Sequence, residues 1–154
     1  MKNQNHFVLI AFLLAFQPVL AQSPANTGLR EELLQMQVED QAVRANTPET
    51  RDEMERFIAI DAKNTARLKE IVSAHGWPSV SLVGEDGASA AWLLAQHADA
   101  DPAFQRQVLA LIEPLVAAGE VKASNYAYLW DRTHDPQRYG AQGTCPANGQ
   151  WEPR

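Results

Sequence analysis

Apolar residues recur along most of this chain at steps of three and four positions, the spacing that gives an α-helix one apolar face. The pattern predicts five helices, at about residues 29–45, 47–74, 87–98, 102–118 and 124–132. Residues 79–82 alternate like a strand, but no second run of similar quality exists to pair with them, so we interpret them as an extended connector. The predicted fold is all-α, a small helical bundle of about five helices with an irregular C-terminal tail.

Capping signals mark the start of three of these helices. Thr47 and Pro48 suit the cap and the first position of the second helix. We expect Asp86 to cap the third helix, and Asp101 followed by Pro102 repeats the cap-and-proline signal for the fourth. These signals set the predicted boundaries more sharply than the periodicity does.

Two apolar patterns indicate which helical surfaces are buried. The third helix is apolar on all sides over residues 90–95, which is typical of a buried helix. The second helix has a single apolar stripe, made of Met54, Phe57, Ile58, Leu68, Ile71 and Val72. We therefore expect the third helix to be buried and the second to face the core with this stripe.

The N-terminus has the three parts of a secretory signal. Lys2 supplies a positive charge, residues 7–16 form an unbroken apolar segment, and residues 19–21 offer the small-residue pattern that a signal peptidase accepts. The alternative is a membrane anchor, but ten apolar residues fall short of the roughly 20 that span a bilayer. We expect an exported protein, periplasmic or secreted, with no stable membrane anchor.

The predicted organisation has four parts. Residues 1–21 are a signal peptide, 22–28 a flexible linker, 29–132 the helical domain and 133–154 an irregular tail. Cys145 in the tail is the only cysteine of the chain, so an intramolecular disulfide is excluded. We interpret it as an incidental free thiol, with intermolecular pairing left open.

Composition narrows the class of partner. The chain has 13 Lys and Arg against 19 Asp and Glu, a formal net charge of −6. Nucleic acid and anionic membrane surfaces both need clustered cations, so neither is expected as a partner. The sequence contains no phosphate loop, nucleophile elbow or paired cysteines, and its histidines lack the spacing of metal ligands. It therefore predicts neither a metal site nor a cofactor.

Charged residues fall on the apolar faces of two predicted helices. Asp40 lies within the stripe of the first helix, with Arg44 one turn later, and Asp61 lies at core phase in the second. An unpaired buried carboxylate is costly, so we expect Asp40 and Arg44 to pair. For each carboxylate, a polar site, an ordinary buried salt bridge and a stripe that turns outward stay open as interpretations.

The segment Gln96-His97-Ala98-Asp99 ends the most apolar helix. Asp99 is placed to orient the imidazole, which would make His97 a general acid or base. The alternative is a histidine that caps the last carbonyl groups of its own helix. Further along the chain, Asp131 and Arg132 follow several aromatic residues, and Tyr139 lies in a glycine-containing turn that suits either a cover over a cavity or an ordinary tail.

Five polar segments occur in a characteristic order. They are Asp40-Gln41-x-x-Arg44, Gly76-Trp77-Pro78, Gln96-His97-Ala98-Asp99, Asn125-Tyr126-Ala127-Tyr128-Leu129-x-Asp131-Arg132 and Gln137-x-Tyr139-Gly140-x-Gln142. In this order they resemble a bacterial family of unknown function, over about residues 29–142. The family has no established activity, so the resemblance implies no mechanism. Ala141 stands where the family usually has Thr, and members tend to continue beyond the position at which this chain ends.

Three functions remain open. The first is binding of a small polar ligand in a pocket between helices. The residues expected to line that pocket are Asp40, Gln41, Arg44, Asp61, Gln96, Asp131, Arg132 and Tyr139. The second is a hydrolase-like enzyme that uses His97 as general acid or base, oriented by Asp99. The third is a structural or protein-interaction domain without a small-molecule site. The first two require carboxylates and the imidazole to meet in one hollow.

Overall fold

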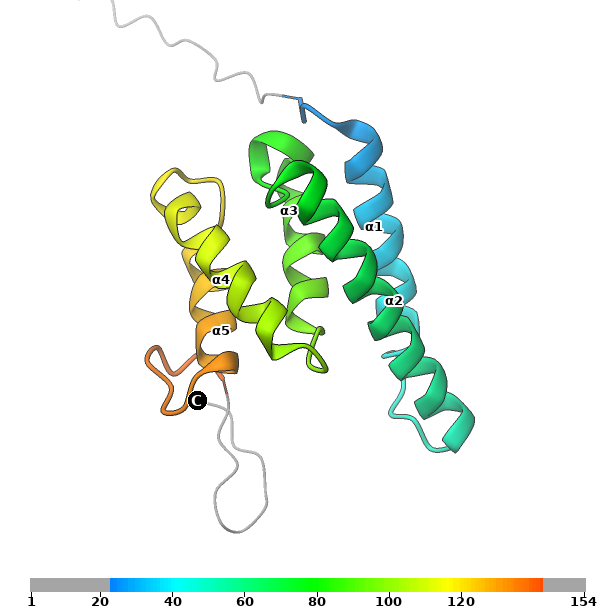
Figure 1. The fold of residues 1–154 in the computed structure, drawn as a ribbon. Coiled ribbons are helices and arrows are strands. Elements are labelled where there is room, and N and C mark those ends of the chain that lie inside the picture. The colour runs from blue at the N-terminus through cyan, green and yellow to red at the C-terminus, as the bar shows by residue number, and fades with distance from the viewer. Residues whose placement is uncertain (1–22, 143–154) are drawn as a thin grey trace, which may run out of the picture.

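A computed structural model describes residues 23–142, and in this range it contains five helices and no strand. They are α1 (Thr27–Ala42), α2 (Arg51–His75), α3 (Val80–Gln96), α4 (Pro102–Ala117) and α5 (Ala123–Thr133). Helix α3 lies between the α1–α2 hairpin and the α4–α5 pair (Figure 1). The predicted all-α bundle is confirmed. The expected signal peptide and Cys145 lie outside the described residues.

The core is built around α3. Ala90, Ala91 and Ala95 are fully buried, and their small side chains allow the neighbouring helices to approach closely. Leu33 from α1 and Leu68 from α2 are among the large side chains that fill the space around them. The buried third helix expected from its apolar sequence is confirmed.

Helix α2 begins later than predicted. Its cap is Thr50, whose hydroxyl accepts the Glu53 amide at 3.2 Å while the Glu53 carboxylate accepts the Thr50 amide at 3.0 Å. This capping box satisfies two backbone donors at once, whereas a cap at Thr47 followed by Pro48 offers no such reciprocal pair. The start predicted at Thr47 is therefore wrong. The cap predicted for α4 is confirmed, because Asp101 accepts the Phe104 amide at 3.0 Å.

The extended connector predicted at residues 79–82 is also wrong. Ser79 precedes the first turn of α3, and its carbonyl accepts the Val83 amide at 3.0 Å. Gly84 then interrupts the helix with a φ of 76°, a conformation that glycine adopts without strain. Asp86, the predicted cap, accepts the Gly87 amide at 2.8 Å where the helix resumes. The serine–valine alternation therefore belongs to a single helical turn ahead of a kink.

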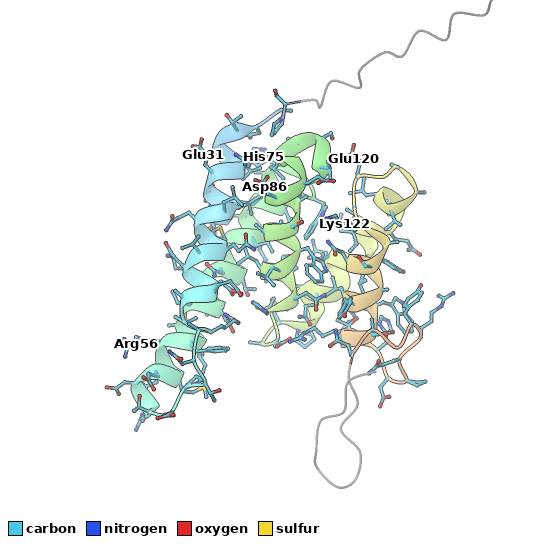
Figure 2. The ribbon with its side chains drawn as sticks, turned by 180° about the vertical axis from the view of Figure 1, so that it is seen from behind. Glu31, Arg56, His75, Asp86, Glu120 and Lys122 are labelled. Carbon is cyan, nitrogen blue, oxygen red and sulfur yellow. The ribbon has the colours of Figure 1, made fainter. Side chains whose placement is uncertain are left out.

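The N-terminal half of α2 extends beyond α3, and Arg56 marks this projecting end (Figures 1 and 2). Met54 and Ile58 are 44% and 58% exposed, so their predicted place in the core is wrong. The helical period places them on one stripe with buried Leu68, but among residues 23–142 no other helix lies beside the N-terminal end of α2 (Figure 1). Among residues 23–142, no helix combines the length and apolarity that crossing a membrane requires.

Candidate functional site

Asp40, in the last turn of α1, is completely buried and is the centre of a polar network. Its carboxylate accepts hydrogen bonds from Gln41 Nε2 at 2.7 Å, from Arg44 Nη1 at 2.8 Å and from His97 Nδ1 at 2.9 Å. The expected Asp40–Arg44 pair is therefore present. These three donors compensate for the burial of the carboxylate.

The electrostatics of this network keep Asp40 ionised. Burial by itself raises the pKa of the Asp40 carboxyl, but hydrogen bonds from His97 and Gln41 and the charges of His97 and Arg44 outweigh it and lower the pKa below its ordinary value. An ionised carboxylate only accepts hydrogen bonds, so His97 Nδ1 carries a hydrogen and donates it. The other ring nitrogen, Nε2, has no hydrogen-bond partner within residues 23–142.

Arg44 extends the network from α1 to α2. Its Nη2 donates to Asp61 Oδ1 at 2.6 Å, and its guanidinium lies 4.3 Å from the centre of the Phe57 ring. The guanidinium therefore has a carboxylate on each side and an aromatic face beside it. Asp61 is consequently paired, with its side chain 19% exposed.

His97 follows α3 as its C-cap residue, and its side chain bonds to α1 instead of to the carbonyl groups of its own helix. Asp40 therefore takes the orienting role that the sequence suggested for Asp99. Asp99 is held elsewhere: it accepts Arg132 Nε from α5 at 2.7 Å and Gln105 Nε2 from α4 at 3.3 Å. The prediction that Asp99 orients the imidazole is wrong, because the arginine of α5 occupies this carboxylate.

His97 opens onto a groove of about 410 Å³ between α2 and the connection from α3 to α4. We call this the His97 groove. Its lining consists of Phe57, Ile58, Asp61, Ala62, Thr65, Ala66, Lys69, His97, Asp99, Ala100 and Asp101. The Asp40 network thus ends at a concave, largely apolar surface, as a small-molecule site requires.

The predicted site residues near the C-terminus lie apart from this groove. Asp131 is buried and accepts the backbone amides of Arg138, Tyr139 and Ala141 at 2.8, 2.9 and 2.6 Å. It therefore fastens the segment that follows α5. Tyr139 is exposed and packs edge-on against Trp130. Arg132, which pairs with Asp99, connects this region with the groove.

Gln96 and Lys69 are two further polar side chains near the network. Gln96 is buried, and its Nε2 has no hydrogen-bond partner within the described residues. Lys69 lines the His97 groove and was not predicted, because it lies between apolar positions of α2 and carries no distinctive signal. Within residues 23–142, no group of three His, Cys, Asp or Glu side chains is arranged to hold a metal ion.

Comparison with known families shows to which family the chain belongs. The model of a family of unknown function, DUF6624, matches residues 27–146. The chain belongs to this family. No curated protein and no solved structure matches it. The matched range of this DUF6624 protein includes the Asp40 network, the His97 groove and the segment fastened by Asp131, and the family brings no activity to any of them.

Proposed function

We propose that this protein binds a small, neutral, partly apolar molecule in the His97 groove. The observation that carries the proposal is that every charged side chain lining the groove already has a partner of opposite charge. Asp61 pairs with Arg44, Lys69 with Asp101, and Asp99 with Arg132. Because each carboxylate of the lining has one basic partner of its own, the groove has no surplus charge to attract a strongly charged ligand or to compensate one that enters.

The remaining lining supports a ligand with an apolar body and one hydrogen-bonding group. Phe57, Ile58 and Ala62 offer apolar contact. His97 offers Nε2, and Asp40 fixes the ring orientation from behind. A ligand hydroxyl or amide N–H at Nε2 would therefore meet a nitrogen whose direction is set before binding, which lowers the entropy lost on association.

Matched aromatic fragments test this proposal. Benzyl alcohol and benzamide are neutral, whereas benzoate and benzylammonium have similar size and carry a charge. We expect the neutral pair to shift the His97 Nε2 resonance in ¹⁵N NMR spectra at about millimolar concentrations, and the charged pair to shift it much less. The neutral pair should also shift the ring resonances of Phe57, which lines the groove. His97→Gln should abolish this second shift, while His134→Gln, which alters a histidine stacked on Trp130, should leave it unchanged.

Equal responses to all four fragments would contradict the charge argument, and no response to any of them would remove the binding proposal.

The proposed place of action is outside the inner membrane. The signal-like sequence of residues 1–21 supports this part of the proposal.

A hydrolytic activity is the second candidate, favoured by the fully buried carboxylate at His97 Nδ1. With its hydrogen on Nδ1, the uncharged form of His97 has a lone pair at Nε2, and this form would take a proton from a water that attacks a bound ester. Hydrolysis of p-nitrophenyl acetate that is lost in His97→Gln and retained in His134→Gln would support this candidate. Equal rates in both variants would remove it.

A further inference from the structure

Asn64 is a buried amide without hydrogen bonds. It lies on α2 three residues after Asp61 and four before Leu68, and only 2% of its surface is exposed. Neither its Oδ1 nor its Nδ2 has a hydrogen-bond partner among residues 23–142. A buried amide in this state destabilises the fold, so a leucine at this position would be more stable than the asparagine.

The fold satisfies the buried amide of Gln105, whereas Gln96 Nε2 lacks a partner as Asn64 does. Gln105 on α4 is 3% exposed, and its Nε2 donates to the carbonyl groups of Ala95 and Gln96 at 3.1 and 3.2 Å. Asn64 therefore differs from a comparable side chain in the same molecule. Proteins keep destabilising residues of this kind where function requires them.

Asn64 lines a second groove, of about 490 Å³, between the outer faces of α1 and α2. We call this the Asn64 groove. Its lining consists of Glu32, Gln35, Met36, Glu39, Lys63, Asn64, Ala66, Arg67 and Glu70. It shares only Ala66 with the His97 groove, so the two are separate sites.

Ion pairs cross the Asn64 groove on both sides of the asparagine. Lys63 bonds to Glu39 at 2.7 Å, and Arg67 bonds to Glu32 at 2.6 Å, in each case joining α2 to α1. These side chains are substantially exposed, and exposed pairs contribute little free energy, so an incoming ligand can rearrange them. With Glu70 included, three carboxylates face two basic side chains, and the lining has a net negative charge.

We propose that the Asn64 groove binds a small organic cation that also carries an amide group. The ligand's ammonium group would bond to the carboxylates that the rearranged ion pairs expose. Its amide would accept a hydrogen bond from Asn64 Nδ2 and donate one to Asn64 Oδ1, so that both unsatisfied atoms gain a partner. This site does not depend on the function proposed for the His97 groove.

The test uses two probes and two variants of the full chain. N-acetyl-lysinamide has both required groups, and N-acetyl-norleucinamide has the same shape and amides without the ammonium. We expect N-acetyl-lysinamide to bind saturably, at least tenfold more tightly than the norleucine compound, and to shift the Asn64 side-chain amide signal in NMR spectra. Asn64→Leu should abolish this binding and raise Tm by about 3–6 °C. Gln105→Leu should lower Tm, because it replaces a buried amide that has hydrogen-bond partners. At temperatures where this variant is folded, it should bind N-acetyl-lysinamide as wild type does, because Gln105 does not line the Asn64 groove.

Three results of these experiments would overturn the proposal. If Asn64→Leu lowers Tm, then Asn64 is a stabilising residue and the proposal is overturned. If the two probes bind equally, or if neither moves the Asn64 signal, the cationic amide is not the ligand class. A shift seen in wild type and retained in Asn64→Leu would place binding elsewhere and overturn the proposal as well.

Discussion

Asp40 and Asn64 are polar side chains on adjacent helices, and both are almost completely withdrawn from solvent. Asp40 accepts hydrogen bonds from Gln41, Arg44 and His97, whereas Asn64 has no partner within the described part of the chain. The number of partners, and not burial, separates their roles. Asp40 forms its hydrogen bonds with groups of the protein and so fixes the orientation of the His97 ring. The donor and acceptor of Asn64 stay available for hydrogen bonds with a ligand.

This difference also decides how each position bears on stability. Removal of a buried group that is bonded leaves its partners unsatisfied, whereas removal of an unbonded group leaves none. Substitutions at the Asp40 network should therefore destabilise the protein, and Asn64→Leu should do the reverse. The following predictions test this contrast, beginning with the largest effect.

Replacement of Asp40 by alanine should cause the greatest loss. The change leaves His97 and the largely buried Arg44 without their shared acceptor, and should lower the free energy of unfolding by about 3 kcal/mol. Urea unfolding at neutral pH measures the effect. Asp61→Ala is the matched control, because Asp61 is partly exposed and Arg44 would keep Asp40, so a loss of about 1 kcal/mol is expected. Equal losses in the two variants would contradict the central role of Asp40.

Acid should weaken the protein partly through the same carboxylate. The pKa of Asp40 is lower in the folded state than the ordinary value of about 3.9, so its stabilisation is complete above that value and is lost as the pH falls through the folded-state pKa. Protonation of Asp40 should lower the free energy of unfolding by less than Asp40→Ala does, because the protonated side chain still occupies the same space and leaves no cavity. Unfolding curves below about pH 4 should therefore be less pH-dependent in Asp40→Asn than in wild type. If the pH dependence of stability is the same in Asp40→Asn and wild type, other carboxylates account for all of the loss in acid.

Local patterns predicted much of the fold and part of the site. Helical periodicity identified five helices, and the four-residue spacing of Asp40 and Arg44 predicted their pair. The start of α2 was misplaced because Thr47 and Thr50 are both acceptable caps, and only the reciprocal bond with Glu53 distinguishes them. Local patterns of this kind describe one helix at a time.

The rest depended on which helices meet. The bond between Asp40 and His97 joins residues 57 positions apart, and the phase of a residue on its helix does not say which helix faces it. Asp99 was the nearer carboxylate in sequence, but Arg132 holds it. Asn64 has the same core phase as Asp61 and could have been found by that signal, although its lack of partners is visible only in three dimensions.

The smallest effect is expected at the ion pairs that cross the Asn64 groove. Arg67→Gln removes bonds to Glu32 and Glu70 that are exposed to solvent, and should lower the free energy of unfolding by about 0.5 kcal/mol, less in high salt. Urea unfolding at low and high salt measures this, with Arg44→Gln as the buried counterpart expected to lose several times more. A loss at Arg67 as large as that at Arg44 would mean that the pair is too strong to rearrange. A ligand would then have no route to Asn64, so the cost of this exposed pair decides whether the buried amide can act as a binding group at all.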